Sequence, residues 1–184
     1  MNRETSVIIS GFGGQGALFA GQLLAYASMD QGQFVTWIPS YGPEMRGGTA
    51  HCTVIVSEQP IGAPIVDRPQ IALVLNAPSH DKYEPLVQPS GLLVANSSLI
   101  DDRSLRSDLD AIYLPANGIA ETCGSVKVSN MVLLGAMLAH VPLLPLEALE
   151  QALRDHLPAR KQALLQTNFD ALRHGHKVSA TINV

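Results

Sequence analysis

The residues best suited to chemistry in this sequence are a cluster of glycines and one glutamine near its start. The stretch GFGGQG places Gly11, Gly13 and Gly16 in the pattern G-x-G-x-x-G, after a β-branched run and before small and apolar residues at helical spacing. A strand, a tight turn and a helix are therefore expected, with backbone N–H groups and the helix N-terminus facing an anion. The candidate phosphate-facing residues are Gly13, Gly14, Gln15 and Gly16.

The glycine turn leaves two interpretations open, because glycines also serve tight turns and close helix packing without any ligand. A dinucleotide site needs an Asp or Glu at the end of the second strand to hold the ribose. Here the strand predicted over residues 33–38 ends in Ile38, Pro39 and Ser40. The sequence therefore disfavours NAD, and we expect Gln15 to present its side-chain amide beside the backbone donors.

A second stretch, PSYGPEMRGGTAHC, places an aromatic residue, a carboxylate and a guanidinium among residues that bend the chain. Glu44 and Arg46 are two apart, so in an extended segment they point to the same side and can pair with each other or with a partner. Gly47 and Gly48 let a ligand approach Arg46 closely. The alternative is a solvated loop with a surface ion pair worth ~0–1 kcal/mol. The candidate partner-interface residues are Tyr41, Glu44, Arg46, Gly47 and Gly48.

These motifs must be positioned by alternating strands and helices. Strands are predicted over residues 6–10, 33–38, 49–57, 71–76, 91–98 and 111–116, and helices over 17–29, 129–139, 145–156 and about 158–174. The pattern predicts a three-layer, Rossmann-like α/β fold with a mostly parallel sheet and a helical C-terminal region. One strand, beginning at Thr49, is expected to be antiparallel because the link before it is too short for a helical crossover. Residues 1–184 are expected to form a single domain.

Other polar residues have structural explanations. His51 and Cys52 are adjacent in a predicted strand, so their side chains point to opposite faces. A short helix is expected around His80 and Asp81, with Ser79 as its cap. Asn76 and Asn96 follow buried strands at the edge where open α/β sheets bind ligands, so a ligand role and a structural role both stay open for them.

Composition excludes several classes of function. The 184 residues are 46% hydrophobic and 15% charged, with a net charge of −4 and no run of Lys or Arg, so neither nucleic acid nor a membrane surface is an expected partner. The two cysteines lack the spacing of a metal or cluster site, so this chain cannot hold an iron–sulfur cluster alone. No segment resembles a signal peptide, and we expect a cytoplasmic protein. The low charge favours a buried interface.

Several motifs, in order, resemble the gamma subunit, or gamma domain, of the 2-oxoacid:ferredoxin oxidoreductases. They are GFGGQG, AGQLLAYA, PSYGPEMRGGTAHCTVIVS, NAPSHDK and NSSLI, which lie within residues 11–100. The long second motif is more similar to the 2-oxoglutarate and branched-chain 2-oxoacid enzymes than to the pyruvate enzymes. The similarity extends more weakly to the C-terminal helices.

The resemblance implies an oxidoreductase that decarboxylates a 2-oxoacid on thiamine diphosphate, reduces ferredoxin through iron–sulfur clusters and forms acyl-coenzyme A. It places thiamine diphosphate and magnesium in alpha and beta subunits and the clusters in a ferredoxin-like delta subunit. The gamma domain is associated with the coenzyme A side of the site, which makes the glycine turn and Arg46 candidates for coenzyme A phosphates. No catalytic or metal-binding residue is expected here, and the isolated chain is expected to be inactive.

Two other classes of function stay open. A purely structural scaffold subunit would have the same glycine turn plugged by a partner side chain. A stand-alone nucleotide-binding protein would need a nicotinamide or flavin site, which the missing ribose acid argues against.

Overall fold

The computed structural model describes residues 4–101 and 103–182 apart from 42–48, and for Tyr41 and Arg160 it describes the backbone only. The strands are β1 (Glu4–Phe12), β2 (Phe34–Tyr41), β3 (Thr49–Ser57), β4 (Ile71–Val74), β5 (Leu92–Asn96) and β6 (Asp110–Leu114). The α-helices are α1 (Ala17–Asp30), α2 (Ala77–Tyr83), α3 (Ala116–Thr122), α4 (Ser129–His140), α5 (Leu146–His156) and α6 (Leu165–Ser179). Three 3-10 helices are η1 (Glu84–Leu86), η2 (Val126–Val128) and η3 (Ala159–Leu164).

The strands form one sheet in the order β2-β3-β1-β4-β5-β6. β3 is antiparallel to both of its neighbours, while β1, β4, β5 and β6 pair in parallel. Seven residues separate β2 from β3 in the sequence, which is too few for the helical crossover that a parallel pair needs. The predicted fold class, with one antiparallel strand, is therefore confirmed.

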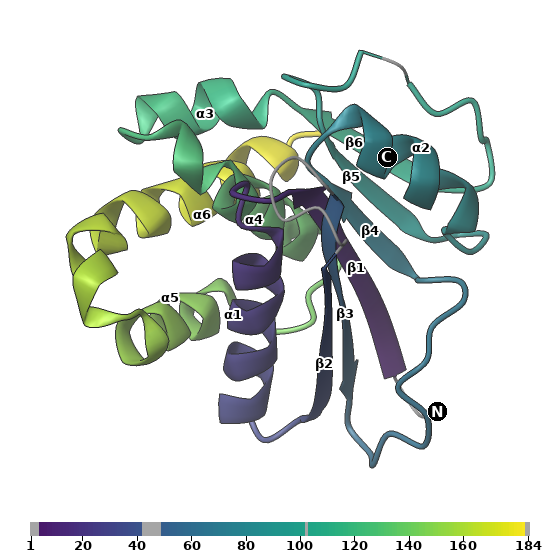
Figure 1. Ribbon diagram of the computed structural model, residues 1–184, viewed down its shortest axis with the longest axis horizontal. Coiled ribbons are helices and arrows are strands. Elements are labelled where there is room, and N and C mark those ends of the chain that lie inside the picture. The colour runs from purple at the N-terminus through teal and green to yellow at the C-terminus, as the bar shows by residue number, and fades with distance from the viewer. Residues whose placement is uncertain (1–3, 42–48, 102, 183–184) are drawn as a thin grey trace.

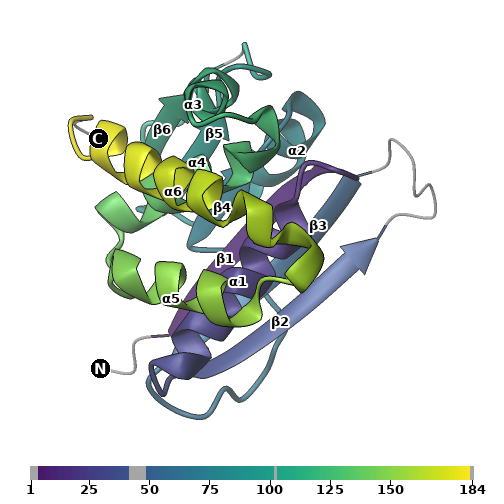
Figure 2. The same ribbon diagram turned by 90° about the vertical axis from the view of Figure 1, so that its left-hand side faces the viewer.

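Helices cover both faces of the sheet and make three layers (Figures 1 and 2). On one face, α1, α4, α5 and α6 enclose the larger core, to which β1 contributes Val7 and Ile9. On the other face, α2 and the segments after it enclose a smaller core around Ile8, with Tyr83 from α2. Alternate residues of one strand thus enter different cores, as the pleat of a strand buried on both faces requires.

The helices α4 and α6 cross with their backbones in contact. A Cβ atom on Gly135 would lie 2.1 Å from the carbonyl oxygen of Leu172, and one on Gly175 would lie 2.0 Å from the carbonyl oxygen of Val132. No side chain fits at either position, so two glycines set the distance between these helices. The helix predicted over residues 129–139 is confirmed as α4, in which residues 129–138 are all buried.

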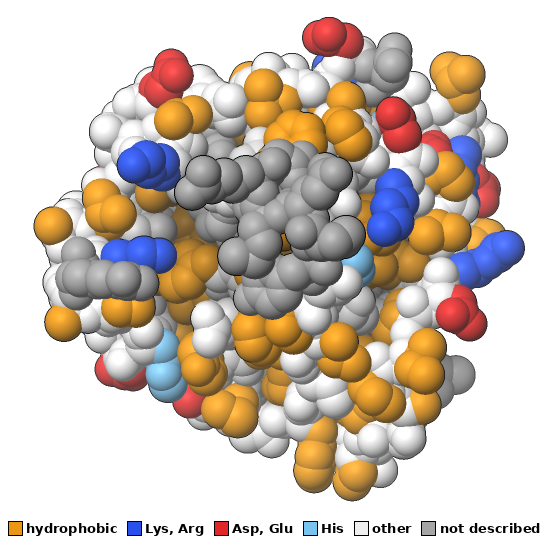
Figure 3. All heavy atoms as spheres, viewed as in Figure 1, with side chains coloured by type: hydrophobic (Ala, Val, Ile, Leu, Met, Phe, Trp, Pro, Cys, Tyr) orange, Lys and Arg blue, Asp and Glu red, His pale blue; other side chains and the backbone are white. Residues whose placement is uncertain are grey.

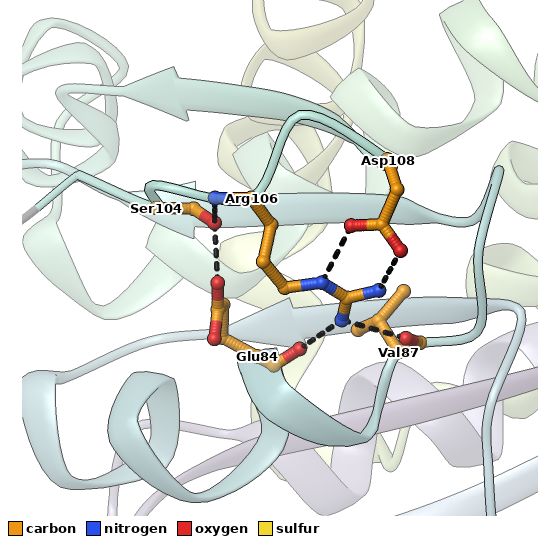
Figure 4. A network of polar contacts seen from close by, with 5 residues as sticks. All are labelled: Glu84, Val87, Ser104, Arg106 and Asp108. Carbon is orange, nitrogen blue, oxygen red and sulfur yellow. Dashed lines mark hydrogen bonds and ion pairs between the residues drawn. The ribbon is translucent and has the colours of Figure 1, made fainter.

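An arginine holds the segment before β6 against η1, on the α2 side of the sheet (Figure 4). The guanidinium of Arg106 donates to both carboxylate oxygens of Asp108 at 2.8 Å. It also donates to the carbonyl oxygens of Glu84 and Val87, at 2.9 and 2.7 Å. Ser104 adds a hydrogen bond from its hydroxyl to the Glu84 carboxylate. The pKa of Asp108 is lowered, chiefly by the hydrogen bonds from Arg106.

Three details differ from the sequence-based expectations. The C-terminal helix begins as the 3-10 helix η3, so α6 runs from Leu165 to Ser179 instead of starting near Pro158 and ending near His174. The short helix α3 was not predicted. The cap of α2 is Asn76, whose side-chain oxygen accepts from the backbone N–H of Ser79 at 2.9 Å, and not Ser79 itself. No helix within the described residues is long and apolar enough to cross a membrane.

Candidate functional site

The glycine turn lies between two neighbouring strands, β1 and β4, whose following helices pack on opposite faces of the sheet. After β1 the chain enters α1 on one face, and after the adjacent parallel strand β4 it enters α2 on the opposite face (Figure 1). Such a switch between neighbouring parallel strands leaves a crevice at their carboxyl ends, which is the usual ligand site of open α/β sheets. Gly13 and Gly14, at this edge, are exposed.

Backbone geometry explains why the turn needs glycine at two of the predicted positions. Gly14 has φ 100° and Gly16 has φ 78°, in the left-handed region that disfavours other residues. The turn closes with a hydrogen bond from the Gln15 amide to the Phe12 carbonyl at 3.1 Å. Gly16 is the N-cap of α1 and offers no side-chain oxygen to the first amides of the helix. Those amides lack intrahelical acceptors and are available to an anion.

Gln15 faces the protein and not the crevice mouth. Its side-chain oxygen accepts hydrogen bonds from the Phe12 amide at 2.6 Å and the Asn76 amide group at 2.8 Å. Its side-chain nitrogen donates to the Leu75 carbonyl at 3.3 Å. The expectation that this side chain is presented with the backbone donors is therefore wrong. Gln15 instead joins the end of β1 to the end of β4 and fixes the shape of the turn.

Asn130, in the first turn of α4, holds the turn from the other side and was missed in the sequence. Its side-chain nitrogen donates to the Gly16 carbonyl at 2.9 Å, although the two residues are 114 positions apart. A Cβ atom on Gly16 would lie 2.5 Å from that nitrogen. Gly16 is thus required both by its φ angle and by the approach of Asn130. The only signal in the sequence is a polar residue at the start of an apolar run, and the structure shows that it is buried.

Two helix N-termini meet at the turn. The contact between Asn130 and Gly16 places the first turn of α4 against the N-cap of α1. Neither helix has an acidic residue in its first turn, and neither N-cap residue gives a side-chain hydrogen bond; in α4 the amide of Ser129 donates to the Val126 carbonyl and that of Met131 to the Asn130 side chain. The partial positive charges of both N-termini are therefore not neutralised by a carboxylate of these helices, and the turn is suited to an anion.

The second sequence motif begins and ends at the same edge of the sheet as the turn. Phe12, just before the turn, is paired with Thr49, and Tyr41 is paired with Ala50. The end of β2 and the start of β3 therefore lie at the edge of the sheet that holds the glycine turn. Gly42 and the predicted interface residues Glu44, Arg46, Gly47 and Gly48 lie outside the described residues, and of Tyr41 the backbone alone is described.

The two asparagines at the strand ends have their polar groups occupied within the protein. Asn76 caps α2 and bonds Gln15. Asn96 accepts hydrogen bonds from the amides of Ser98 and Ala116, at 3.2 and 3.1 Å, and donates to Asn117 at 3.0 Å. Both side chains are almost fully buried. Their geometry favours a structural role, which is to anchor the loops that line the crevice.

Cys52 and His51 carry no arrangement for nucleophilic catalysis. Cys52 faces α1 while the ring of His51 packs 5.5 Å from that of Tyr83 on the other face, as expected for neighbours in a strand. Burial raises the pKa of the Cys52 thiol to about 12. Partial burial, with a smaller contribution from Lys82, lowers the pKa of His51. Within the described residues, no group of three His, Cys, Asp or Glu side chains is placed to hold a metal ion.

Comparison with known proteins identifies the class of this fold and site. Residues 6–178 match the family described as pyruvate ferredoxin/flavodoxin oxidoreductase, and the chain belongs to that family. It is similar to ketoisovalerate oxidoreductase subunit VorA of Methanothermobacter thermautotrophicus, with 36% identity over 94% of this chain and 36% of VorA. It is also similar to 2-oxoglutarate synthase subunit KorC of Methanocaldococcus jannaschii, with 31% identity over 93% of this chain and 91% of KorC. The chain thus spans about a third of the length of VorA and nearly all of KorC.

Solved structures agree with this assignment. The gamma subunit of a keto/oxoacid ferredoxin oxidoreductase from Geobacter sulfurreducens superposes with a TM-score of 0.83 at 28% identity, covering 97% of this chain and 99% of the subunit. The resemblance to the gamma subunit seen in the sequence is therefore confirmed. A 2-oxoglutarate:ferredoxin oxidoreductase from Magnetococcus marinus, with 2-oxoglutarate, coenzyme A and succinyl-CoA bound, shares the fold with a TM-score of 0.88 at 20% identity, over 98% of this chain and 32% of that one.

Proposed function

We propose that this chain is the gamma unit of a multi-subunit, thiamine-diphosphate-dependent 2-oxoacid:ferredoxin oxidoreductase. The reaction converts a 2-oxoacid and coenzyme A to acyl-coenzyme A, CO2 and one proton, and passes two electrons to ferredoxin. The proposal is supported by the family match over residues 6–178 together with the similarity to gamma and KorC subunits. We take residues 1–184 as one gamma-type domain, and we place the reaction in the cytoplasm.

The substrate of the proposed complex is 2-oxoglutarate. The extent of the similarity supports this choice, because KorC subunits match the chain over nearly their whole length. A branched-chain 2-oxoacid is the second candidate, and it is favoured by the higher identity to VorA. The alpha and beta subunits would bind thiamine diphosphate and magnesium, and a ferredoxin-like delta subunit would hold the iron–sulfur clusters.

The role of this chain is to shape the coenzyme A side of the active site. The observation that carries this assignment is the glycine turn at the switch point, where two helix N-termini meet without an acidic side chain. In this proposal the backbone amides of Gly13, Gly14 and Gly16 face a coenzyme A phosphate, and Arg46 adds a charge-assisted hydrogen bond. Gln15, whose own amide donates to the Phe12 carbonyl, holds the turn in place. Tyr41, Glu44, Gly47 and Gly48 join Arg46 at the subunit interface.

The proposal is tested by purifying the tagged chain from its native host and identifying the subunits that accompany it by mass spectrometry. We expect thiamine-binding and cluster-binding subunits in fixed ratio to this chain. We also expect the complex to reduce a viologen dye when it receives 2-oxoglutarate and coenzyme A. Faster reduction with 2-oxoisovalerate would select the branched-chain alternative. Purification of the chain without any such subunit would contradict the proposal.

A further inference from the structure

The pairing of the sheet determines which backbone groups of β2 are free. The amide of Leu75 donates to the carbonyl of Ser10 at 2.9 Å, so Ser10 turns its backbone groups toward β4. The backbone N–H and C=O groups of successive residues in a strand point to opposite sides. The groups of Ile9 therefore point toward β3, and those of its partner Cys52 point toward β1. The next residue of β3, Thr53, therefore turns its backbone groups toward β2.

The same alternation gives the outer edge of β2. Ile38 is paired with Thr53 and turns toward β3, so Val35, Trp37 and Pro39 turn their backbone groups away from the sheet. The position of Pro39 agrees with this assignment, since proline has no N–H and is tolerated where that group would face out of the sheet. Tyr41, the last residue of β2, also faces outward, so three outward N–H groups, those of Val35, Trp37 and Tyr41, and four outward carbonyls form a free edge.

This edge lacks the usual protection against pairing with another chain. Exposed edges are normally blunted by charged residues, yet neither β2 (FVTWIPSY) nor β3 (TAHCTVIVS) contains Asp, Glu, Lys or Arg. On the face opposite α1, Phe34 is 47% exposed and Ile38 is 42% exposed. Hydrophobic side chains gather on the part of the surface over β2 and β3, in the lower half of Figure 3. An uncharged edge of eight residues is expected to be covered in the working protein.

Two neighbouring cavities lie beside this edge on the α1 side. Their volumes are about 450 and 200 Å³, and both are lined by Gln22, Tyr26 and Trp37. Val35 adds to the smaller cavity and Phe19 to the larger. A strand added to β2 would place every second side chain on the α1 side, roughly 7 Å apart. Such side chains would face the wall formed by Gln22, Tyr26 and Trp37, which the two cavities share.

We propose that an extended segment of a partner subunit adds to β2 as the next strand of the sheet, with apolar or aromatic side chains at alternate positions filling the two cavities. In this mode of recognition, main-chain hydrogen bonds supply affinity and the pockets supply specificity. The inference rests on the proposed function, because it takes the partner from the same oxidoreductase complex. It adds the surface and the chemistry by which that partner is recognised.

The charges at the larger cavity distinguish a partner subunit from a second copy of this chain. Lys161 is exposed at this cavity, with its amine 5.1 Å from the centre of the Phe19 ring. No described carboxylate forms an ion pair with it, whereas His156 on the same wall already pairs with Asp30 at 3.0 Å. The added segment is therefore expected to carry an acidic residue beside its apolar ones. A second copy of β2 has no acidic residue to offer.

Hydrogen exchange of the whole complex and of the free chain tests the proposal. In the free chain, we expect the amides of Val35 and Trp37 to exchange rapidly, while those of Thr36 and Ile38, which bond to β3, are protected. In the complex, exchange of Val35 and Trp37 should slow by about 100-fold. Unchanged exchange of these two amides in an assembled complex would overturn the proposal. If the Val35 and Trp37 amides instead become protected in the free chain as its concentration rises, the edge pairs with a second copy of this chain. That result would also overturn the proposal.

A pair of variants provides an independent measurement. Val35→Pro removes an outward amide, and Val35→Thr keeps that amide and is the matched control. We expect Val35→Pro to weaken capture of the partner subunits at least tenfold and Val35→Thr to leave it unchanged. The comparison requires that the two variants have equal thermal stability. Equal capture by both variants would contradict the proposal. If the native chain captures no subunit at all, the proposed function fails together with this inference, whereas a complex that assembles through another surface refutes the inference alone.

Discussion

At the residue scale, the glycine turn depends on amide side chains that do not themselves face a ligand. Gln15 bonds the Phe12 amide and the Asn76 side chain, and Asn130 bonds the Gly16 carbonyl. These contacts hold backbone amides at the crevice mouth without placing a carboxylate beside them. Positioning groups of this kind allow a turn made largely of glycine to keep one conformation, because glycine alone leaves the backbone free.

Replacement of Gln15 tests its positioning role. Gln15→Leu removes three hydrogen bonds while keeping a side chain of similar size, and it leaves the Phe12 amide and the Asn76 side chain without their acceptor. We expect the free energy of unfolding to fall by ~1–3 kcal/mol. The control is Gln22→Leu on α1, where a single hydrogen bond to Tyr26 at 3.3 Å is lost and a change within about 0.5 kcal/mol is expected. Chemical denaturation measures both, and equal effects would contradict the role given to Gln15.

The two cysteines differ in predicted reactivity. Cys52 is fully buried, and burial raises its pKa to about 12, so its thiolate is scarce at pH 8. Cys123 lies 3.4 Å from the imidazole of His174; burial raises its pKa as well, but its side chain is partly exposed and open to a reagent. Iodoacetamide at pH 8 should therefore modify Cys123 in the native chain and leave Cys52 intact, as intact-mass and peptide-mass measurements can show. Modification of Cys52 at a similar rate would show that β3 and α1 separate more easily than their packing indicates.

At the scale of elements, the order of strands and helices could be predicted because each of the longer elements has a strong local pattern. The short link before Thr49 even indicated the antiparallel strand. The helix α3 could not be predicted, since its seven residues, ANGIAET, include an asparagine and a glycine and lack an amphipathic pattern. Its first amide is instead accepted by Asn96, 20 positions earlier. Likewise, Asn130 meets Gly16 only once α4 has folded against α1, so no local pattern could reveal the contact.

The crossing of α4 and α6 gives a prediction at this scale. Gly135→Ala would place a methyl group 2.1 Å from the Leu172 carbonyl oxygen, a backbone atom that cannot rotate away. The helices must then separate, and we expect a loss of at least ~1–3 kcal/mol in the free energy of unfolding. Gly118→Ala on α3 is the matched control, because its Cβ atom meets open space and alanine favours helix by ~1 kcal/mol. Thermal melts in which both variants are stabilised would contradict the close crossing.

At the scale of the whole molecule, the surface of the chain has properties expected of a subunit in a larger complex. Few charges cover it, and β2 offers an uncharged free edge. The family match and the gamma-subunit structures agree with this interpretation. The fold class and the gamma-type assignment could be derived from the sequence, whereas the edge of β2 and its cavities depend on strand pairing that only the structure provides.

Arg46 gives a prediction for the assembled complex. Because we assign Arg46 to a partner carboxylate or a coenzyme A phosphate, Arg46→Ala should leave the melting temperature of the free chain nearly unchanged. In the complex, loss of a charge-assisted hydrogen bond of ~1.5–3 kcal/mol should raise the apparent KM for coenzyme A, or the Kd for subunit association, by about 10- to 100-fold. Steady-state kinetics and a thermal melt measure the two effects. Strong destabilisation of the free chain with unchanged kinetics and assembly would make Arg46 an internal structural residue.

The central claim is that this chain acts only within the complex and is needed there for the use of coenzyme A. The most direct test is reconstitution from separately purified subunits, with 2-oxoacid-dependent and coenzyme-A-dependent reduction of a viologen dye as the measurement. Our account predicts no reduction by this chain alone and full reduction when all subunits are present. It also predicts that omission of this chain alone abolishes activity or raises the KM for coenzyme A at least tenfold. Full activity at an unchanged KM without this chain would contradict the account.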